Sequence, residues 1–124
     1  MTEMPETRQI VLIVEDEPIQ RMMAVDLVEN AGFEAVEATD ATQAVAILER
    51  RTDIRLVFTD IDMPRGMDGM KLAALIRNRW PPIELILISG KFKPRLEDLP
   101  VRGVFFSKPY RSHDIIEAMR RMAV

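Results

Sequence analysis

Short apolar runs alternate with helical patterns five times along the chain, and no other feature restricts its fold as strongly. Because the runs at 10–14 and 85–88 are apolar at every position, they are typical of strands buried on both faces, as in a parallel sheet. The alternation predicts an α/β fold: a three-layer sandwich with a parallel five-stranded sheet, helices on both faces and right-handed crossovers. The five predicted strands span 10–14, 33–37, 54–59, 85–88 and 104–106.

Capping signals mark where most of the helices begin and end. Pro18 suits the first turn of the first helix, and Gly32 suits its end. Asp40 and Asp68 are expected to cap the second and third helices, and Gln43 would complete a capping box with Asp40. A last helix is expected to begin near residue 112.

The segment 91–102 interrupts this regular pattern. Pro94 and Pro100 leave space for only one or two helical turns, so a short or irregular fourth helix is expected. We expect one domain at residues 10–123, after a tail at residues 1–9. Because the chain stops directly after its last helix, a stand-alone protein is expected, although a piece of a longer protein would end in the same way.

Composition excludes several classes of function. The chain has no cysteine, so a metal would need oxygen ligands or the single His113. Its net charge of −3 gives no general attraction to nucleic acid or an anionic membrane, and no direct binding to either is expected. No apolar run approaches the roughly 20 residues that span a bilayer, and the polar first nine residues contain no signal-peptide core. A cytoplasmic protein is therefore predicted.

Polar residues follow four of the five predicted strands, and the carboxyl ends of parallel strands meet at one edge of the sheet. Each residue alone has an ordinary explanation as a loop or capping residue, but such explanations would have to hold at four strand ends together. Crowded carboxylates repel each other unless a cation joins them, and Mg²⁺ prefers such hard oxygen ligands. The set therefore predicts phosphoryl transfer to a carboxylate, with the central Asp60 as nucleophile. The residues are Glu15 and Asp16, Asp60 and Asp62, Ser89 and Gly90, and Lys108.

Four short motifs carry a resemblance to a known family. They are Val14-Glu15-Asp16-Glu17, Asp60-x-x-Met63-Pro64, Ser89-Gly90 and Lys108-Pro109-Tyr110. Together they resemble the receiver domain of bacterial response regulators, over nearly the whole chain. The resemblance implies the flavodoxin-like fold of chemotaxis regulators, with strand order 2-1-3-4-5, and a phosphorylation-dependent switch in a two-component system rather than an enzyme.

The resemblance also implies the acceptor and the metal ligands. Asp60 matches the aspartate that accepts a phosphoryl group from a sensor histidine kinase or a histidine phosphotransfer protein. Glu15 and Asp16 match the acidic pair that holds Mg²⁺ together with Asp60. Asp62 matches the position whose backbone carbonyl is a metal ligand.

The remaining positions match the groups that respond to the phosphoryl group. Ser89 and Lys108 match the hydroxyl and the ammonium that bind it, and Gly90 lets its backbone N–H approach closely. Phe105 matches the family's rotating aromatic residue, although it lacks the hydroxyl of the commoner tyrosine. An unknown downstream protein would recognise the phosphorylated form. A second departure from the family pattern is a loop one residue longer, at Arg65-Gly66.

Two other functions can be weighed against this hypothesis. Residues 58–62 also resemble the first motif of haloacid-dehalogenase-type phosphohydrolases, with Asp60 as nucleophile and Asp62 as acid/base. That family places its second acidic pair late in the chain, whereas here the pair precedes Asp60. A nucleotide-binding or electron-carrying flavodoxin-like protein would need a glycine-rich loop after the first strand, and this loop is acidic.

Overall fold

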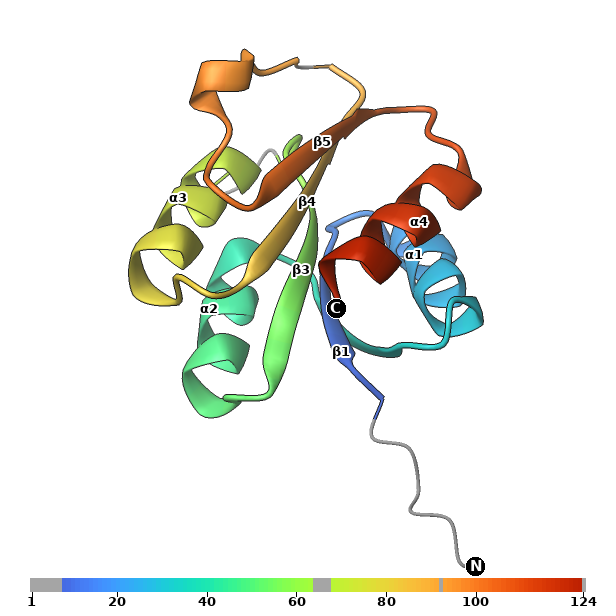
Figure 1. Ribbon diagram of the computed structural model, residues 1–124, viewed down its shortest axis with the longest axis horizontal. Helices are drawn as coiled ribbons and strands as arrows, with labels where there is room; N and C mark the ends of the chain where they lie inside the picture. The colour runs from blue at the N-terminus through green and yellow to red at the C-terminus, as the bar shows by residue number, and fades with distance from the viewer. Residues whose placement is uncertain (1–7, 64–67, 92, 124) are drawn as a thin grey trace, which may run out of the picture.

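Five parallel strands form one sheet in the order β2-β1-β3-β4-β5, as the family resemblance implies, and Figure 1 shows β1, β3, β4 and β5 of this sheet. The structure is a computed structural model and describes residues 8–63, 68–91 and 93–123. The elements are β1 (Ile10–Val14), α1 (Pro18–Asn30), β2 (Glu34–Ala38), α2 (Ala41–Arg50), β3 (Ile54–Asp60), α3 (Gly69–Arg79), β4 (Glu84–Ser89), a 3-10 turn (Leu96–Asp98), β5 (Gly103–Ser107) and α4 (Ser112–Met122).

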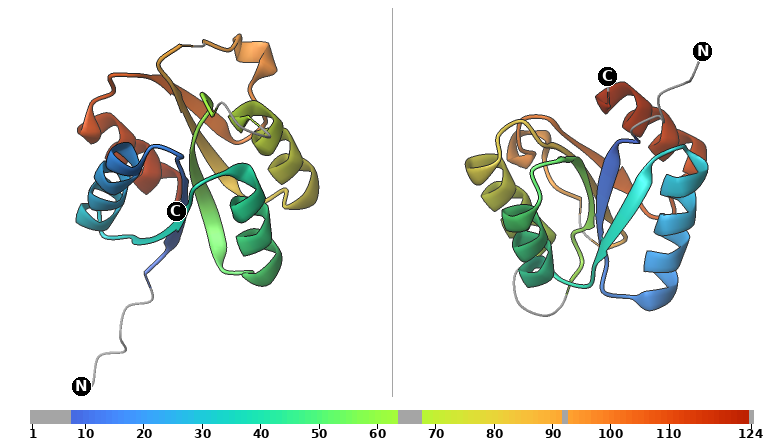
Figure 2. Two further views of the ribbon diagram at one scale, coloured as in Figure 1. Left: turned by 180° about the vertical axis from the view of Figure 1, so that it is seen from behind. Right: turned by 90° about the horizontal axis from the view of Figure 1, so that it is seen from below.

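Helices cover both faces of the sheet, α1 and α4 on one face and α2 and α3 on the other (Figures 1 and 2). Alternate residues of the central strands enter the two cores. Val11 and Ile13 of β1 pack with Leu27 of α1 and Met119 of α4. Leu12 of β1 instead belongs to the second core, which contains apolar residues of α2 and α3. The three-layer α/β architecture is confirmed.

Side-chain caps stand at the starts of α2 and α3, where the sequence predicts them. The Asp40 side chain accepts a hydrogen bond from the Gln43 N–H at 2.8 Å, and Gln43 Oε1 accepts one from the Thr39 N–H at 2.8 Å. This reciprocal pair is the predicted capping box. Asp68 caps α3 by accepting from the backbone N–H of the residue three positions later. Gly32 has a φ of 97°, the left-handed conformation that ends α1 with a glycine.

The second strand begins one residue later than predicted. Phe33 is buried, but its N–H donates to Val28 O at the end of α1, so it completes the helix terminus instead of the sheet. The short or irregular fourth helix is confirmed, since the described part of the segment between β4 and β5 contains only the 3-10 turn at Leu96–Asp98. The longer loop at Arg65-Gly66 lies outside the described residues. Within the described ranges, no helix has the length and apolar character to cross a membrane.

Candidate functional site

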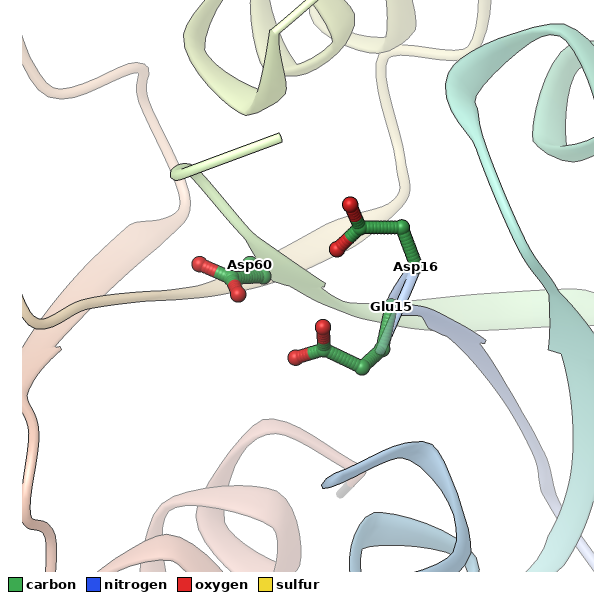
Figure 3. A group of neighbouring side chains, drawn as sticks. All are labelled: Glu15, Asp16 and Asp60. Atoms are coloured by element: carbon green, nitrogen blue, oxygen red, sulfur yellow. The ribbon is translucent and has the colours of Figure 1, made fainter. Parts of the chain in front are cut away.

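Three carboxylates meet at the carboxyl ends of β1 and β3 (Figure 3). Glu15 and Asp16 directly follow β1, and Asp60 is the last residue of β3. Each offers an oxygen that lies within 4.8 Å of the others. The parallel pairing of β1 with β3 explains this arrangement, since it sets Val14 beside Thr59 and so brings the two strand ends together. We call these three residues the acid cluster.

Lys108 supplies the positive charge of the acid cluster. It follows β5 and its Nζ lies 2.9 Å from Asp60 Oδ2 and 3.8 Å from Glu15 Oε1. The ammonium also donates to Gln20 Oε1 of α1 at 2.6 Å. Burial acts to lower the pKa of Lys108, but the hydrogen bond to Asp60 and the neighbouring negative charges outweigh it and raise this pKa above its usual value. Lys108 is therefore held in its charged form.

Glu15 is one of the buried carboxyl groups of this cluster. Only 3% of the Glu15 surface is exposed to solvent. Burial, and after it the charge of Asp60, raises its pKa to about 8, although the Glu17 N–H and Lys108 act in the opposite direction. A second cation would favour the ionised form of Glu15. Three clustered carboxylates are hard oxygen ligands of the kind that Mg²⁺ prefers, so the residues present fit that ion.

A second group of contacts lies beside the acid cluster, at the end of β4. The Ser89 hydroxyl donates to Asp62 Oδ1 at 2.6 Å, and the N–H groups of Gly90 and Lys91 donate to Asp62 Oδ2 at 2.8 and 3.2 Å. We call these three donors the donor cluster. Burial acts to raise the pKa of Asp62, but the three hydrogen bonds and the charge of Lys108 together outweigh it and hold this pKa below its usual value.

Backbone contacts hold Asp60 from two sides. The Asp62 N–H donates to Asp60 Oδ1 at 2.9 Å. Behind the strand, Gly69 at the start of α3 lies so close that an added Cβ would overlap the Asp60 carbonyl oxygen and lie 2.6 Å from Ile61 Cα. Only glycine fits there, because both neighbouring groups are backbone and cannot swing away.

The family comparison agrees with this geometry. Residues 11–120 match the family model of the response regulator receiver domain. The chain belongs to this family. Its five-stranded sheet in the order 2-1-3-4-5 and its strand-end carboxylates are thus those of a receiver domain from a two-component system.

Several curated relatives are similar in sequence to this chain. The response regulator protein FleR of Pseudomonas aeruginosa is 31% identical over 92% of this chain and 24% of its own length. The nitrogen assimilation regulatory protein NtrX of Azorhizobium caulinodans is 33% identical over 90% of this chain and 25% of its own. The sensor kinase CckA of Brucella abortus is 30% identical over 90% and 12%. The chain thus spans about a quarter or less of these three relatives.

Solved receiver structures have the same fold. A response regulator receiver protein from Sinorhizobium medicae superposes with a TM-score of 0.82 at 24% identity, covering 93% of this chain and 94% of the other. The receiver domain of the hybrid histidine kinase CckA gives 0.76 at 28% identity, covering 93% and 99%.

The structure places the predicted site residues in two groups. Glu15, Asp16 and Asp60 come together around the Lys108 ammonium, whereas the Asp62 side chain is bonded to Ser89, Gly90 and Lys91. Phe105 is half-buried and packs against the core on the α2 and α3 side.

Sequence reasoning did not identify three structural partners. Gln20 gave no signal, because nothing in a helical glutamine shows which ammonium it will meet. Gly69 directly follows the residue that caps α3. Because glycine does not favour helix formation, its presence at this position was the available clue. The contacts of the Asp62 carboxylate depend on loop geometry and left no trace in the sequence.

Proposed function

We propose that this receiver domain is a phosphorylation switch in which Asp60 accepts a phosphoryl group from a phosphohistidine. The observation that carries the proposal is the position of the Asp60 carboxylate, which lies within the acid cluster and 2.9 Å from the Lys108 ammonium. A carboxylate nucleophile beside a fixed cation and at a cation-binding cluster is equipped for phosphoryl transfer.

The proposed Mg²⁺ ligands are the carboxylates of Glu15, Asp16 and Asp60. The backbone carbonyl of Asp62 is added to them by likeness to the family. The chemistry that a bound Mg²⁺ supplies is neutralisation of the charge on the acid cluster and on the transferring phosphoryl group.

The transfer itself exchanges one bond for another. The phosphorus–nitrogen bond of the phosphohistidine breaks while a bond forms between phosphorus and a carboxylate oxygen of Asp60. The imidazole leaves with the electron pair of the broken bond and takes up a proton. Lys108 stays beside Asp60 throughout the transfer, and its ammonium donates a hydrogen bond to a phosphoryl oxygen. This new contact replaces part of the pairing between the Lys108 and Asp60 charges.

A cavity of about 650 Å³ gives a phosphodonor access to Asp60. Glu15, Asp60 and Lys108 line one part of it, and apolar side chains of α1, including Leu27, line another. A donor with a flat aromatic ring next to its phosphoryl group, such as phosphohistidine, suits this mixed lining.

The donor cluster and the residues next to it are proposed to respond to phosphorylation of Asp60. Ser89 and Gly90 are proposed to bind the phosphoryl group together with Lys108, and Phe105 to change its packing as they move. A protein that recognises the changed surface would transmit the signal. We also propose that the receiver domain spans residues 10–123, after a tail at residues 1–9. A cytoplasmic location is proposed as well.

A phosphohydrolase is not favoured by the position of the acidic residues. Two of the three residues of the acid cluster precede Asp60 in the chain and none follows it, and no other group of three or more metal-ligating side chains is found among the described residues. The acidic pair of this site, Glu15 and Asp16, precedes Asp60, and this order separates the site from the phosphohydrolase pattern. We therefore propose a switch and not an enzyme.

Intact mass spectrometry after incubation with acetyl phosphate and Mg²⁺ tests the proposal. The expected result is a base-labile adduct of about 80 Da, the mass of one phosphoryl group, on the wild type and none on Asp60→Asn. Asp53→Asn is the matched control, because Asp53 is an exposed aspartate paired with Arg51 away from the site. An unmodified wild type that also fails to bind Mg²⁺ would overturn the proposal, and steady release of phosphate from unrelated esters would favour the phosphohydrolase.

A further inference from the structure

The Asp62 side chain occupies the donor cluster. It accepts the Ser89 hydroxyl at 2.6 Å with one oxygen, and the N–H groups of Gly90 and Lys91 at 2.8 and 3.2 Å with the other. Ser89 is 1% exposed, so its hydroxyl has little access to water as an alternative partner. One carboxylate thus collects three donors from a single strand end, and it shares the Lys91 N–H with Ser89 Oγ, which also lies 3.2 Å from that nitrogen.

Asp62 also connects these donors to the phosphoryl acceptor. While its carboxylate binds the donor cluster, its own N–H donates to Asp60 Oδ1 at 2.9 Å. A carboxylate two residues beyond Asp60 is thereby fixed between Asp60 and the end of β4.

A phosphoryl group on Asp60 would need the same donors. Both a carboxylate and a phosphoryl group are anions that accept hydrogen bonds from hydroxyl and backbone N–H groups. The Ser89 hydroxyl and the Gly90 N–H have one hydrogen each, so neither can make a full hydrogen bond to both anions at once. The two anions must therefore compete.

We propose that the Asp62 side chain is a latch, an internal anion that holds Ser89, Gly90 and Lys91 until a phosphoryl group on Asp60 displaces it. The inference rests on the proposed function, since it concerns the regulation of the same site. Asp62 acts through the donors and is a positioning residue. Its hydrogen bonds lower the affinity of the unphosphorylated protein for a phosphoryl group, and their rupture links phosphorylation to movement of the loop after β4.

The test is a titration with beryllofluoride, a mimic of a phosphoryl group on aspartate, at saturating Mg²⁺. Asp62→Ala is expected to bind beryllofluoride about tenfold more tightly than the wild type, which corresponds to the loss of one charge-assisted hydrogen bond that must otherwise be broken. Equal or weaker binding by Asp62→Ala would overturn the latch. The amide resonance of Gly90 in the unliganded protein gives a second readout, because its N–H loses the Asp62 acceptor in this variant and is expected to move upfield, whereas the Lys91 N–H keeps the Ser89 hydroxyl oxygen at 3.2 Å.

Asp62→Ala also removes a negative charge, and two controls separate that effect from the latch. In the Ser89→Ala background the gain from Asp62→Ala is expected to fall at least threefold, because the shortest bond of the latch is already absent. Raising the NaCl concentration to about 1 M screens a through-space charge but not the hydrogen bonds. A gain that is equal in both backgrounds and disappears in high salt would show a charge effect alone and overturn the latch.

Beryllofluoride binding and adduct formation together distinguish failure of the latch from failure of the proposed function. If neither the wild type nor Asp62→Ala binds beryllofluoride or forms an adduct with acetyl phosphate, the proposed function fails and the latch with it. If both bind with the same affinity and both form the adduct, the proposed function stands and only the latch is overturned. Binding by Asp62→Ala without detectable binding by the wild type would support the latch most strongly.

Discussion

The site has two halves, the acid cluster around Lys108 and the donor cluster around Asp62. Each half contains one internal charge, and these two charges have opposite signs. In the acid cluster, one ammonium, Lys108, stands among three carboxylates. In the donor cluster, one carboxylate, Asp62, meets three hydrogen-bond donors.

The balance of charge differs between the halves. Among the described residues, Lys108 is the cation paired with the acid cluster, and burial, followed by the charge of Asp60, still raises the pKa of Glu15 to about 8. The donors of the second half are matched by the two oxygens of Asp62, whose pKa is lowered. The difference underlies our two proposals, in which the first half gains a cation and the second exchanges one anion for another.

Removal of Lys108 should produce the largest change in metal affinity. In Lys108→Met the acid cluster loses its cation, and we expect Mg²⁺ to bind roughly tenfold more tightly, because unit charges a few ångströms apart interact by up to about 4 kcal/mol near a protein surface. Calorimetric titration with Mg²⁺ measures this. The exposed Lys71 of α3 provides the control Lys71→Met, which should change the affinity less than about twofold. Unchanged or weaker Mg²⁺ binding in Lys108→Met would show that the ammonium and the metal do not compete for the same charge.

Glycine substitutions should separate the two halves by their backbone packing. Gly69→Ala forces a Cβ into the backbone at Asp60 and Ile61, and overpacking of this kind costs about 1–3 kcal/mol of unfolding free energy. In Gly90→Ala the nearest atoms are those of the Lys108 side chain at 3.6 Å, an ordinary contact, so the change should stay within about 0.5 kcal/mol. Urea denaturation measures both. Equal losses would mean that Asp60 is not held from behind in the way described.

Stability without metal should fall as the pH rises. Because the folded-state pKa of Glu15 is raised from 4.5 to about 8, the folded state binds more protons than the unfolded state between these values, and the unfolding free energy decreases across that window. Glu15→Gln cannot ionise, so its decrease from pH 5 to pH 8.5 should be smaller than that of the wild type by about 1 kcal/mol, a value discounted for water at the open side of the site. Urea denaturation in the presence of EDTA provides the comparison, and parallel pH profiles would contradict it.

Loss of Gln20 should have the smallest effect. Its amide oxygen accepts from Lys108 Nζ at 2.6 Å but carries no charge, so Gln20→Ala leaves the charge of the acid cluster unchanged. We expect a loss of about 0.5 kcal/mol in unfolding free energy and a change in Mg²⁺ affinity below about twofold. A change as large as that in Lys108→Met would mean that Gln20, and not Asp60, fixes the ammonium.

The fold was predictable because each strand carries its own signal. The apolar runs at β1 and β4 and the capping box at Asp40 and Gln43 specify buried strands and helix starts through local chemistry. The strand ends then bring Glu15, Asp16 and Asp60 together once the sheet is parallel.

Other parts of the site depend on distances that no local pattern records. Which carboxylate meets the donors of Ser89 and Gly90 depends on how the chain turns after β3 and β4, and the sequence alone placed Asp62 with the acids. The raised pKa of Glu15 reflects the depth of its burial among residues distant in the sequence.

Backbone amide resonances during a stepwise titration test the difference between the halves most directly. We predict that saturating Mg²⁺ shifts the amides of Asp16 and Ile61, beside the acid cluster, while Gly90 and Lys91 make most of their displacement only when beryllofluoride is added. Displacement of Gly90 and Lys91 completed by Mg²⁺ alone would contradict the account. So would bound beryllofluoride that leaves both amides in place, because the donors of Asp62 would then not be those of the phosphoryl group.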